Sequence, residues 1–242
     1  MKNGNRVGRQ KVLTFAVTVL LMAVLFAVGH GEAVYVNGGG VQVQTGNGRQ
    51  DKVRVVLDAG HGGADPGKIG INGALEKDVN LQITLLVKRY LEAQDIEVVL
   101  TSETEEGLYD ADASNKKVQD MKRRIEKIEE TDPAITVSIH QNSYPEEYVK
   151  GAQVFYYTNS AEGQKLAQLV QTSLIERVDP DNHRQIKPND SYYMLKKAPT
   201  PIIIVECGFL SNSDEAAKLC DPAYQQRVAW AIHMGILQYL NS

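Results

Sequence analysis

Two histidines and two glutamates, far apart in the chain, carry the side chains that a metal-dependent hydrolase needs. His61 lies in the glycine-rich segment DAGHGG, Glu76 in ALEKD, His140 in SIHQN and Glu206 in VECGF. A catalytic zinc site takes three protein ligands from nitrogen and oxygen donors and leaves one position for water. His61, Glu76 and His140 meet this requirement, so we predict that they bind one Zn²⁺ per chain.

Glu206 has a different predicted role. It follows the apolar residues 202–205, a pattern that predicts a buried carboxylate at the end of a strand. An unpaired buried carboxylate is costly, so it needs a cation nearby or a proton to transfer. We predict that Glu206 is the general base, which takes a proton from water and passes it to the leaving amine. The alternative is a salt bridge to a buried Arg or Lys.

Each of these residues has a simpler interpretation when it is taken alone. His61 would be a loop histidine. Glu76 would be a first-turn carboxylate that interacts favourably with the helix dipole, and His140 would be a core histidine with satisfied hydrogen bonds. Their shared position argues for a site, because three of the four residues come at or just after the ends of short apolar runs. These runs are residues 53–57, 135–139 and 202–205. Parallel strands present their carboxyl ends to one edge of a sheet, where sites form in open α/β folds.

The order of apolar patterns predicts the fold class. Strand-like runs at 53–57, 96–101, 135–139, 152–157 and 202–205 alternate with helical patterns near 78–93, 115–130, 161–176 and 223–239. The helical stripes include Val79, Ile83 and Val87, whose spacing lines one face of a helix. We therefore predict a single α/β domain with a mostly parallel twisted sheet and helices on both faces.

The chain divides into three predicted parts. Residues 1–33 combine a basic start with an apolar run at 12–28, which indicates an export signal. The run is long for a cleaved signal peptide and marginal for a spanning helix, so an amino-terminal membrane anchor remains the alternative. Residues 34–52 are rich in Gly, Asn and Gln and are predicted to be a flexible linker. Residues 53–242 are predicted to form the catalytic domain. We expect the protein outside the cytoplasmic membrane, in contact with it only through the N-terminal segment.

Charge and cysteine content narrow the function further. The net charge is −4, and the leader holds four of the cations with one acid, so the remainder is more acidic still. Nucleic-acid binding is excluded, since it needs clustered cations and no basic stripe occurs. Cys207 and Cys220 permit a disulfide in an exported chain, but two buried free thiols are the favoured interpretation.

Four separated motifs resemble one known family. The strings VVLDAGHGGADPG, ALEKDVNL, SIHQN and VECGFLSN are similar to those of zinc-dependent N-acetylmuramoyl-L-alanine amidases of the type-3 class, over about residues 53–240. The resemblance implies hydrolysis of the amide between the muramic acid lactyl group and the first L-alanine of the peptidoglycan stem peptide. His61, Glu76 and His140 fall on the family's zinc ligands, and Glu206 falls on its catalytic glutamate.

Shorter features resemble one subgroup. Only residues 143–150 separate Asn142 from Gly151, which leaves no room for the autoinhibitory insertion of the division amidases. The short chain, its lone N-terminal apolar segment and the HRQIKP connection are similar to the germination-specific amidases of spore formers. That resemblance implies a role in forming muramic-δ-lactam in the spore cortex, a location at the cell wall or in the forespore intermembrane space, a deacetylase acting on the product, and a regulatory partner protein.

Two other functions remain open. The chain would be another zinc peptide hydrolase that cuts within the stem peptide, or a wall-binding module without a working metal site. The stem peptide carries carboxylates that Lys68, Arg124 or Lys187 could bind, although solvated surface charges are the favoured interpretation of all three.

Overall fold

The computed structural model describes residues 33–37, 40–44 and 52–242. The predicted leader, apart from Ala33, lies outside these residues. The chain divides after Asp51 into two units. In the first unit, β1 (Ala33–Asn37) and β2 (Gly40–Gln44) pair as an antiparallel hairpin inside the predicted linker. None of the helices in the described residues has both the length and the apolar composition to span a bilayer.

The second unit, Lys52–Ser242, is built around a six-stranded sheet. Its strands, in spatial order, are β4 (Glu97–Leu100), β3 (Arg54–Ala59), β5 (Ile135–Asn142), β8 (Ile202–Phe209), β6 (Gln153–Tyr157) and β7 (Lys187–Asn189). The first four run parallel, whereas β6 is antiparallel to β8 and β7 is parallel to β6. The prediction of a mostly parallel sheet is confirmed.

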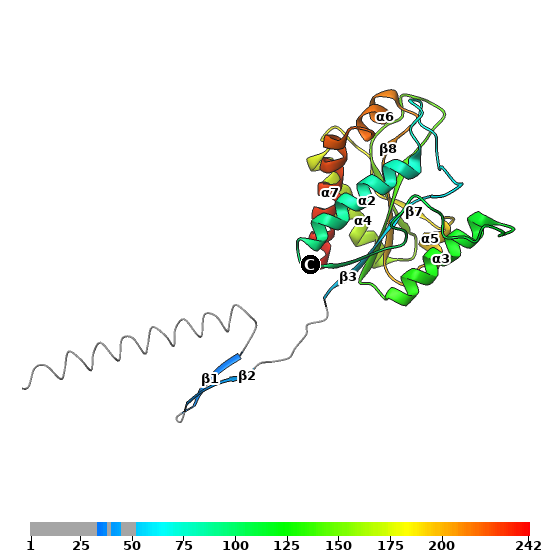
Figure 1. Cartoon of the computed structure of the whole chain (residues 1–242). Coiled ribbons are helices and arrows are strands. Elements are labelled where there is room, and N and C mark those ends of the chain that lie inside the picture. The colour runs from blue at the N-terminus through cyan, green and yellow to red at the C-terminus, as the bar shows by residue number, and fades with distance from the viewer. Residues whose placement is uncertain (1–32, 38–39, 45–51) are drawn as a thin grey trace, which may run out of the picture. The chain divides into compact units, whose positions relative to one another are not determined.

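Helices cover both faces of the sheet, as predicted (Figure 1). On one face lie α2 (Glu76–Glu92), α4 (Ala161–Arg177) and α7 (Pro222–Leu240), and on the other lie α3 (Lys116–Thr131) and α5 (Tyr193–Lys197). A short helix, α6 (Ser213–Leu219), follows β8. Because both faces are covered, the central strands are buried on both sides, and every residue of β8 is buried.

Alternation along the strands divides the core into two layers. Val55 and Leu57 of β3 belong to the larger cluster, together with the buried stripe of α2 that includes Ile83 and Val87. Val56 points the other way and packs with Ile125 and Ile128 of α3. Because the strands are packed on both faces, the carboxyl ends of β3, β5 and β8 are held next to one another at one edge of the sheet.

The strand register places the chemistry-bearing segments side by side. His140 on β5 is paired directly with Glu206 on β8. Ala59 at the end of β3 is paired with Ile139, and the next amide, Gly60 N–H, donates to the Ile139 carbonyl at 3.0 Å. The loop that carries His61 therefore begins beside His140.

Several element boundaries differ from the sequence prediction. β8 continues to Phe209, which is paired with Asn142 across an irregularity in β5, so Glu206 lies inside a strand and not after its end. The connection around Pro180 and Pro188 contains β7 and α5, and α6 was not predicted. These elements have 3, 5 and 7 residues, which is too short for a periodic pattern to identify.

Candidate metal centre

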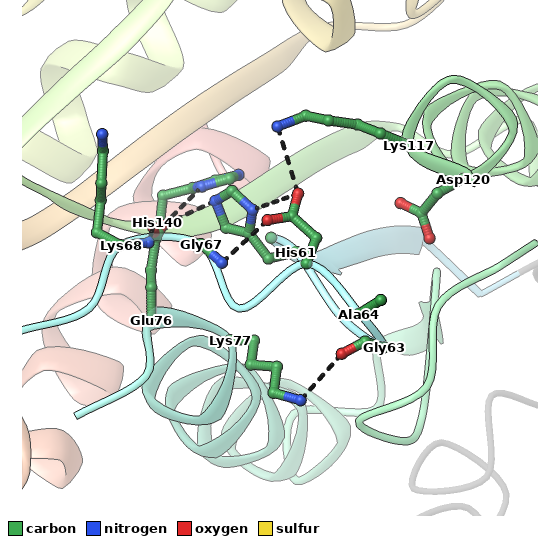
Figure 2. A network of polar contacts seen from close by, with 12 residues as sticks. His61, Gly63, Ala64, Gly67, Lys68, Glu76, Lys77, Lys117, Asp120 and His140 are labelled. Atoms are coloured by element: carbon green, nitrogen blue, oxygen red, sulfur yellow. Dashed lines mark hydrogen bonds and ion pairs between the residues drawn. The ribbon is translucent and has the colours of Figure 1, made fainter. Parts of the chain in front are cut away.

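The three predicted metal ligands lie together at the carboxyl edge of the sheet (Figure 2). One potential ligand atom from each of His61, Glu76 and His140 lies within 4.8 Å of the other two. Glu76 Oε1 is 3.2 Å from His61 Nε2 and 3.0 Å from His140 Nδ1. The imidazole rings meet edge to face, with centroids 5.1 Å apart. The side chains thus converge on one point with the nitrogen and oxygen donors that a transition metal takes.

Glu76 is the buried member of the three, with a relative exposure of 2%. It opens α2, and the N–H of Lys68 donates to its Oε2 at 2.8 Å while the N–H of Gln141 donates to its Oε1 at 3.1 Å. Burial by itself raises the pKa of a carboxyl, but hydrogen bonds and charge from His140 and His61 hold the pKa of Glu76 well below its usual range. Glu76 is therefore a carboxylate, the form that binds a cation.

His61 is oriented by the loop around it. Its backbone is left-handed, with φ 68°, and Nδ1 lies 3.1 Å from Asp65 Oδ2 while Nε2 faces Glu76. Lys117 lies 3.3 Å from the same Asp65 oxygen. A carboxylate on one imidazole nitrogen fixes the tautomer and leaves the other nitrogen free to bind a metal. Glycines make the remaining space, since a Cβ on Gly60 would lie 2.1 Å from the His140 ring.

A buried ionic network supports this loop from below. Arg124 of α3 is 3% exposed and donates to Asp58 Oδ1 at 2.7 Å and to the Ala59 carbonyl at 2.6 Å. The same guanidinium donates to the His61 carbonyl and to Asp120. Burial disfavours the charge, but Asp58 and Asp120 outweigh it and raise the pKa of Arg124. The prediction that Arg124 is a solvated surface charge is wrong, because the residue connects α3 to the metal-binding loop.

Glu206 lies next to the three ligands but is not one of the converging set. It is 8% exposed, and its Oε2 has no hydrogen-bond partner among the described residues. Burial raises the pKa of Glu206 to about 7, and the Glu76 carboxylate acts in the same direction while His140 and His61 oppose it. No described Arg or Lys pairs with Glu206, so the salt bridge that the sequence left open does not form there.

Two cavities meet at this site. The α3 cavity, of about 340 Å³, is lined by Ala64, Tyr109, Lys116 and Arg124 among others, and the β8 cavity, of about 530 Å³, by Glu76, Gln141, Ser143, Tyr192 and Glu206 among others. Both are lined by His61, Asp65, Lys117, Met121, His140 and Met194. His61 and His140 thus border both open spaces, whereas Glu76 borders only the β8 cavity.

Comparison with known proteins identifies the family. Residues 55–238 match the model of a family described as N-acetylmuramoyl-L-alanine amidase. The chain belongs to this family. The enzyme class implied by the sequence motifs is thereby confirmed.

Two relatives of this amidase are especially informative. The germination-specific N-acetylmuramoyl-L-alanine amidase of Bacillus subtilis (strain 168) is 36% identical over 190 residues, which cover 77% of this chain and 79% of the relative. The solved CwlD amidase of Clostridioides difficile, in complex with the GerS lipoprotein, is 38% identical with a TM-score of 0.77, covering 78% of this chain and 99% of that one. A third, the amidase AmiC2 of Nostoc punctiforme, is 33% identical with a TM-score of 0.69 and covers 78% and 98%.

Sequence reasoning about this amidase missed several residues around the ligands. Asp65, Asn80 and Gln141 were not proposed, although each contacts a ligand or the residue beside it. The Asp65-Pro66-Gly67 turn was visible, but nothing in the spacing showed that its carboxylate faces His61. Lys68 lines the β8 cavity, whereas Lys187 lies over the Phe155 ring, 5.7 Å from its centroid.

Both cysteines are free thiols. Cys207 is buried as predicted, and burial raises the pKa of its thiol well above the usual range. Cys220 is exposed, so the prediction of burial is wrong for this residue. It follows α6, the helix that the sequence did not predict.

Proposed function

We propose that this amidase is zinc-dependent, with His61, Glu76 and His140 as the ligands and Glu206 as the general base, and that it acts in spore cortex maturation. The observation that carries the proposal is the convergence of three ligand atoms within 4.8 Å beside a buried carboxyl group that has no cationic partner. The donors are two imidazoles and one carboxylate, the set that catalytic zinc sites use while keeping a position open.

The reaction follows from where these groups lie. When bound, Zn²⁺ would polarise the amide carbonyl of the substrate and make water more acidic. The Glu206 carboxylate takes a proton from the attacking water and then gives it to the L-alanine nitrogen as the C–N bond breaks. Its pKa of about 7, raised by burial, suits this double role, because both protonation states are accessible near neutral pH. His140 lies opposite Glu206 in the strand pairing, and this closeness supports the two proposed roles.

The biological setting is inferred from the relatives. One is named as a germination-specific amidase, and the solved relative is in complex with a lipoprotein. Removal of the stem peptide leaves a free lactyl carboxylate on muramic acid, from which muramic-δ-lactam forms once a deacetylase exposes the amine of the same sugar. We therefore infer a substrate in the spore cortex, an exported enzyme and a regulatory partner protein.

Fragment analysis tests the activity. The purified chain is incubated with spore peptidoglycan, with and without a chelator, and the released products are identified by mass. Intact stem peptides that begin with L-alanine, lost on chelation and restored by added Zn²⁺, are the expected result. Peptides cut internally would instead indicate a different zinc peptide hydrolase.

A variant separates catalysis from wall binding. Glu206→Gln should keep stoichiometric zinc and bind peptidoglycan but release no peptides. If wall binding persists while neither the wild type nor the variant releases any fragment, the chain would be a binding module and the proposal would be wrong.

A further inference from the structure

The two cavities that meet at the metal ligands match a substrate with two arms. The scissile amide joins a neutral sugar to a peptide whose second residue carries a free carboxylate. Resting on the proposed function, we propose that the α3 cavity takes the stem peptide, with Lys116 binding this carboxylate, and that the β8 cavity takes the glycan.

Charge distinguishes the two cavities. The β8 cavity also has a cation, Lys68, but it is lined by two acids, Glu76 and Glu206, and the ionised Glu206 carboxylate repels an anion. The α3 cavity contains neither of them, and its acids are already paired. Asp58 and Asp120 are bound to Arg124, and Asp65 is bound to Lys117 and His61. These pairs lie between 2.5 and 3.3 Å. An anionic peptide is therefore favoured on the α3 side.

Lys116 is the cation that remains available there. It is exposed in the first turn of α3, which contains no acidic residue, and within residues 52–242 it forms no ion pair with a carboxylate. Its ammonium lies 5.3 Å from the centroid of the Tyr109 ring. Tyr109 is itself fixed to the metal-binding loop, because its hydroxyl accepts from the Ala64 N–H at 2.6 Å. Lys116 is thus held close to the loop that carries His61, and the positive end of the helix dipole adds to its field.

The rest of the α3 cavity suits a short peptide. Ala64 and Pro66 line the α3 cavity but not the β8 cavity, and with Met121 and Met194, which line both, they offer apolar atoms that can pack against the methyl group of L-alanine. The β8 cavity instead offers Asn142 and Ser143 as polar groups and the rings of Tyr192 and Tyr193. Hydroxyl-rich sugars with one apolar face are complementary to such a mixture of amides, hydroxyls and aromatic rings.

The proposal is tested with two disaccharide muropeptides that differ in one group. One has the free carboxylate on the second stem residue, and the other has a carboxamide there. Full-length wild-type enzyme should cleave both but favour the acid through a lower KM. Lys116→Gln should raise KM for the acid by up to about fivefold, the upper end of the range for an exposed charge pair, and leave KM for the amide unchanged.

Matched variants make the result decisive. Lys122→Gln removes an exposed lysine from the same helix outside both cavities and should leave KM for both muropeptides unchanged. The proposal is overturned if Lys116→Gln affects acid and amide equally, or if the acid-specific loss follows Lys68→Gln in the β8 cavity instead. If the wild type cleaves neither muropeptide, the proposed function itself has failed. If Lys116→Gln keeps the wild-type preference for the acid, only the proposal for Lys116 has failed.

Discussion

Replacing Arg124 tests whether the buried network beneath the metal site holds His61 in place. The guanidinium contacts two backbone carbonyls of the metal-binding loop, those of Ala59 and His61, and two carboxylates, those of Asp58 and Asp120. Asp58 is 1% exposed and also accepts from the hydroxyls of Thr101 and Ser138, each at 2.6 Å.

Two substitutions should have graded effects. Arg124→Gln leaves two buried carboxylates without a cation, which should cost about 3–5 kcal/mol and lower Tm by roughly 6–20 °C. Arg124→Lys keeps the charge but cannot reach both carbonyls, and losing one bond from a charged donor costs about 1.5–3 kcal/mol. Because His61 then loses its support, zinc affinity in Arg124→Lys should fall about 10- to 100-fold, the range for outer-shell partners of a metal site.

The assay measures zinc affinity by competition with a chelator and, separately, unfolding of the metal-free protein. Arg123→Lys is the matched control, because Arg123 is the neighbouring, partly exposed residue and pairs with Asp110 at 2.7 Å, away from the buried network. It should leave both zinc affinity and Tm unchanged. A folded Arg124→Lys protein with wild-type zinc affinity would refute the argument that this network positions the ligand.

Three further outcomes are expected. Asp65→Asn should lower zinc affinity about 10-fold or more without unfolding the protein, as measured by chelator competition, because His61 Nδ1 loses its carboxylate partner. Gly60→Ala should abolish zinc binding in equilibrium dialysis, since its Cβ would lie 2.1 Å from the His140 ring. In the metal-free protein the pKa of Glu206 is about 7 in the native state and 4.5 in the unfolded state, so between these pH values the native state binds one proton more. The free energy of unfolding should therefore fall as pH rises from about 4.5 to 7. Denaturant titrations at several pH values should show this fall in the wild type and not in Glu206→Gln.

The sequence contained enough to predict the sheet and the convergence of His61, Glu76 and His140 at its edge. His61, His140 and Glu206 each follow a short apolar run, and runs of this kind become parallel strands whose carboxyl ends share one edge. Such an inference needs only local pattern and chain topology. The inference that these side chains meet at one edge does not depend on which strands are neighbours. It was therefore correct although the order of β3, β5 and β8 in the sheet could not be predicted from the sequence.

The supporting residues were not predictable in the same way, because their roles depend on contacts between distant segments. Arg124 is 63 residues from His61 in sequence, and in a helix of alternating charges it looks like any solvated cation. Its burial follows from the packing of α3 against β3. The spacing from Arg124 to Ile128 does place Arg124 on the buried face of α3, but that spacing does not show that the guanidinium reaches Asp58 and the His61 carbonyl. Asp65 was hidden for another reason, since a turn-forming Asp before Pro has a sufficient local explanation.

The backbone of His61 shows how a residue of a local motif depends on contacts from distant segments. A non-glycine residue with φ 68° is strained, so the loop needs outside contacts to keep that conformation. Arg124 supplies them at the carbonyl, Asp65 at Nδ1 and Glu76 at Nε2. The ligand is thus fixed from three directions by residues of α3, its own loop and α2. A metal site on such a loop can be preorganised only in the folded domain, which is why motif spacing identifies its ligands but leaves out the residues that hold them.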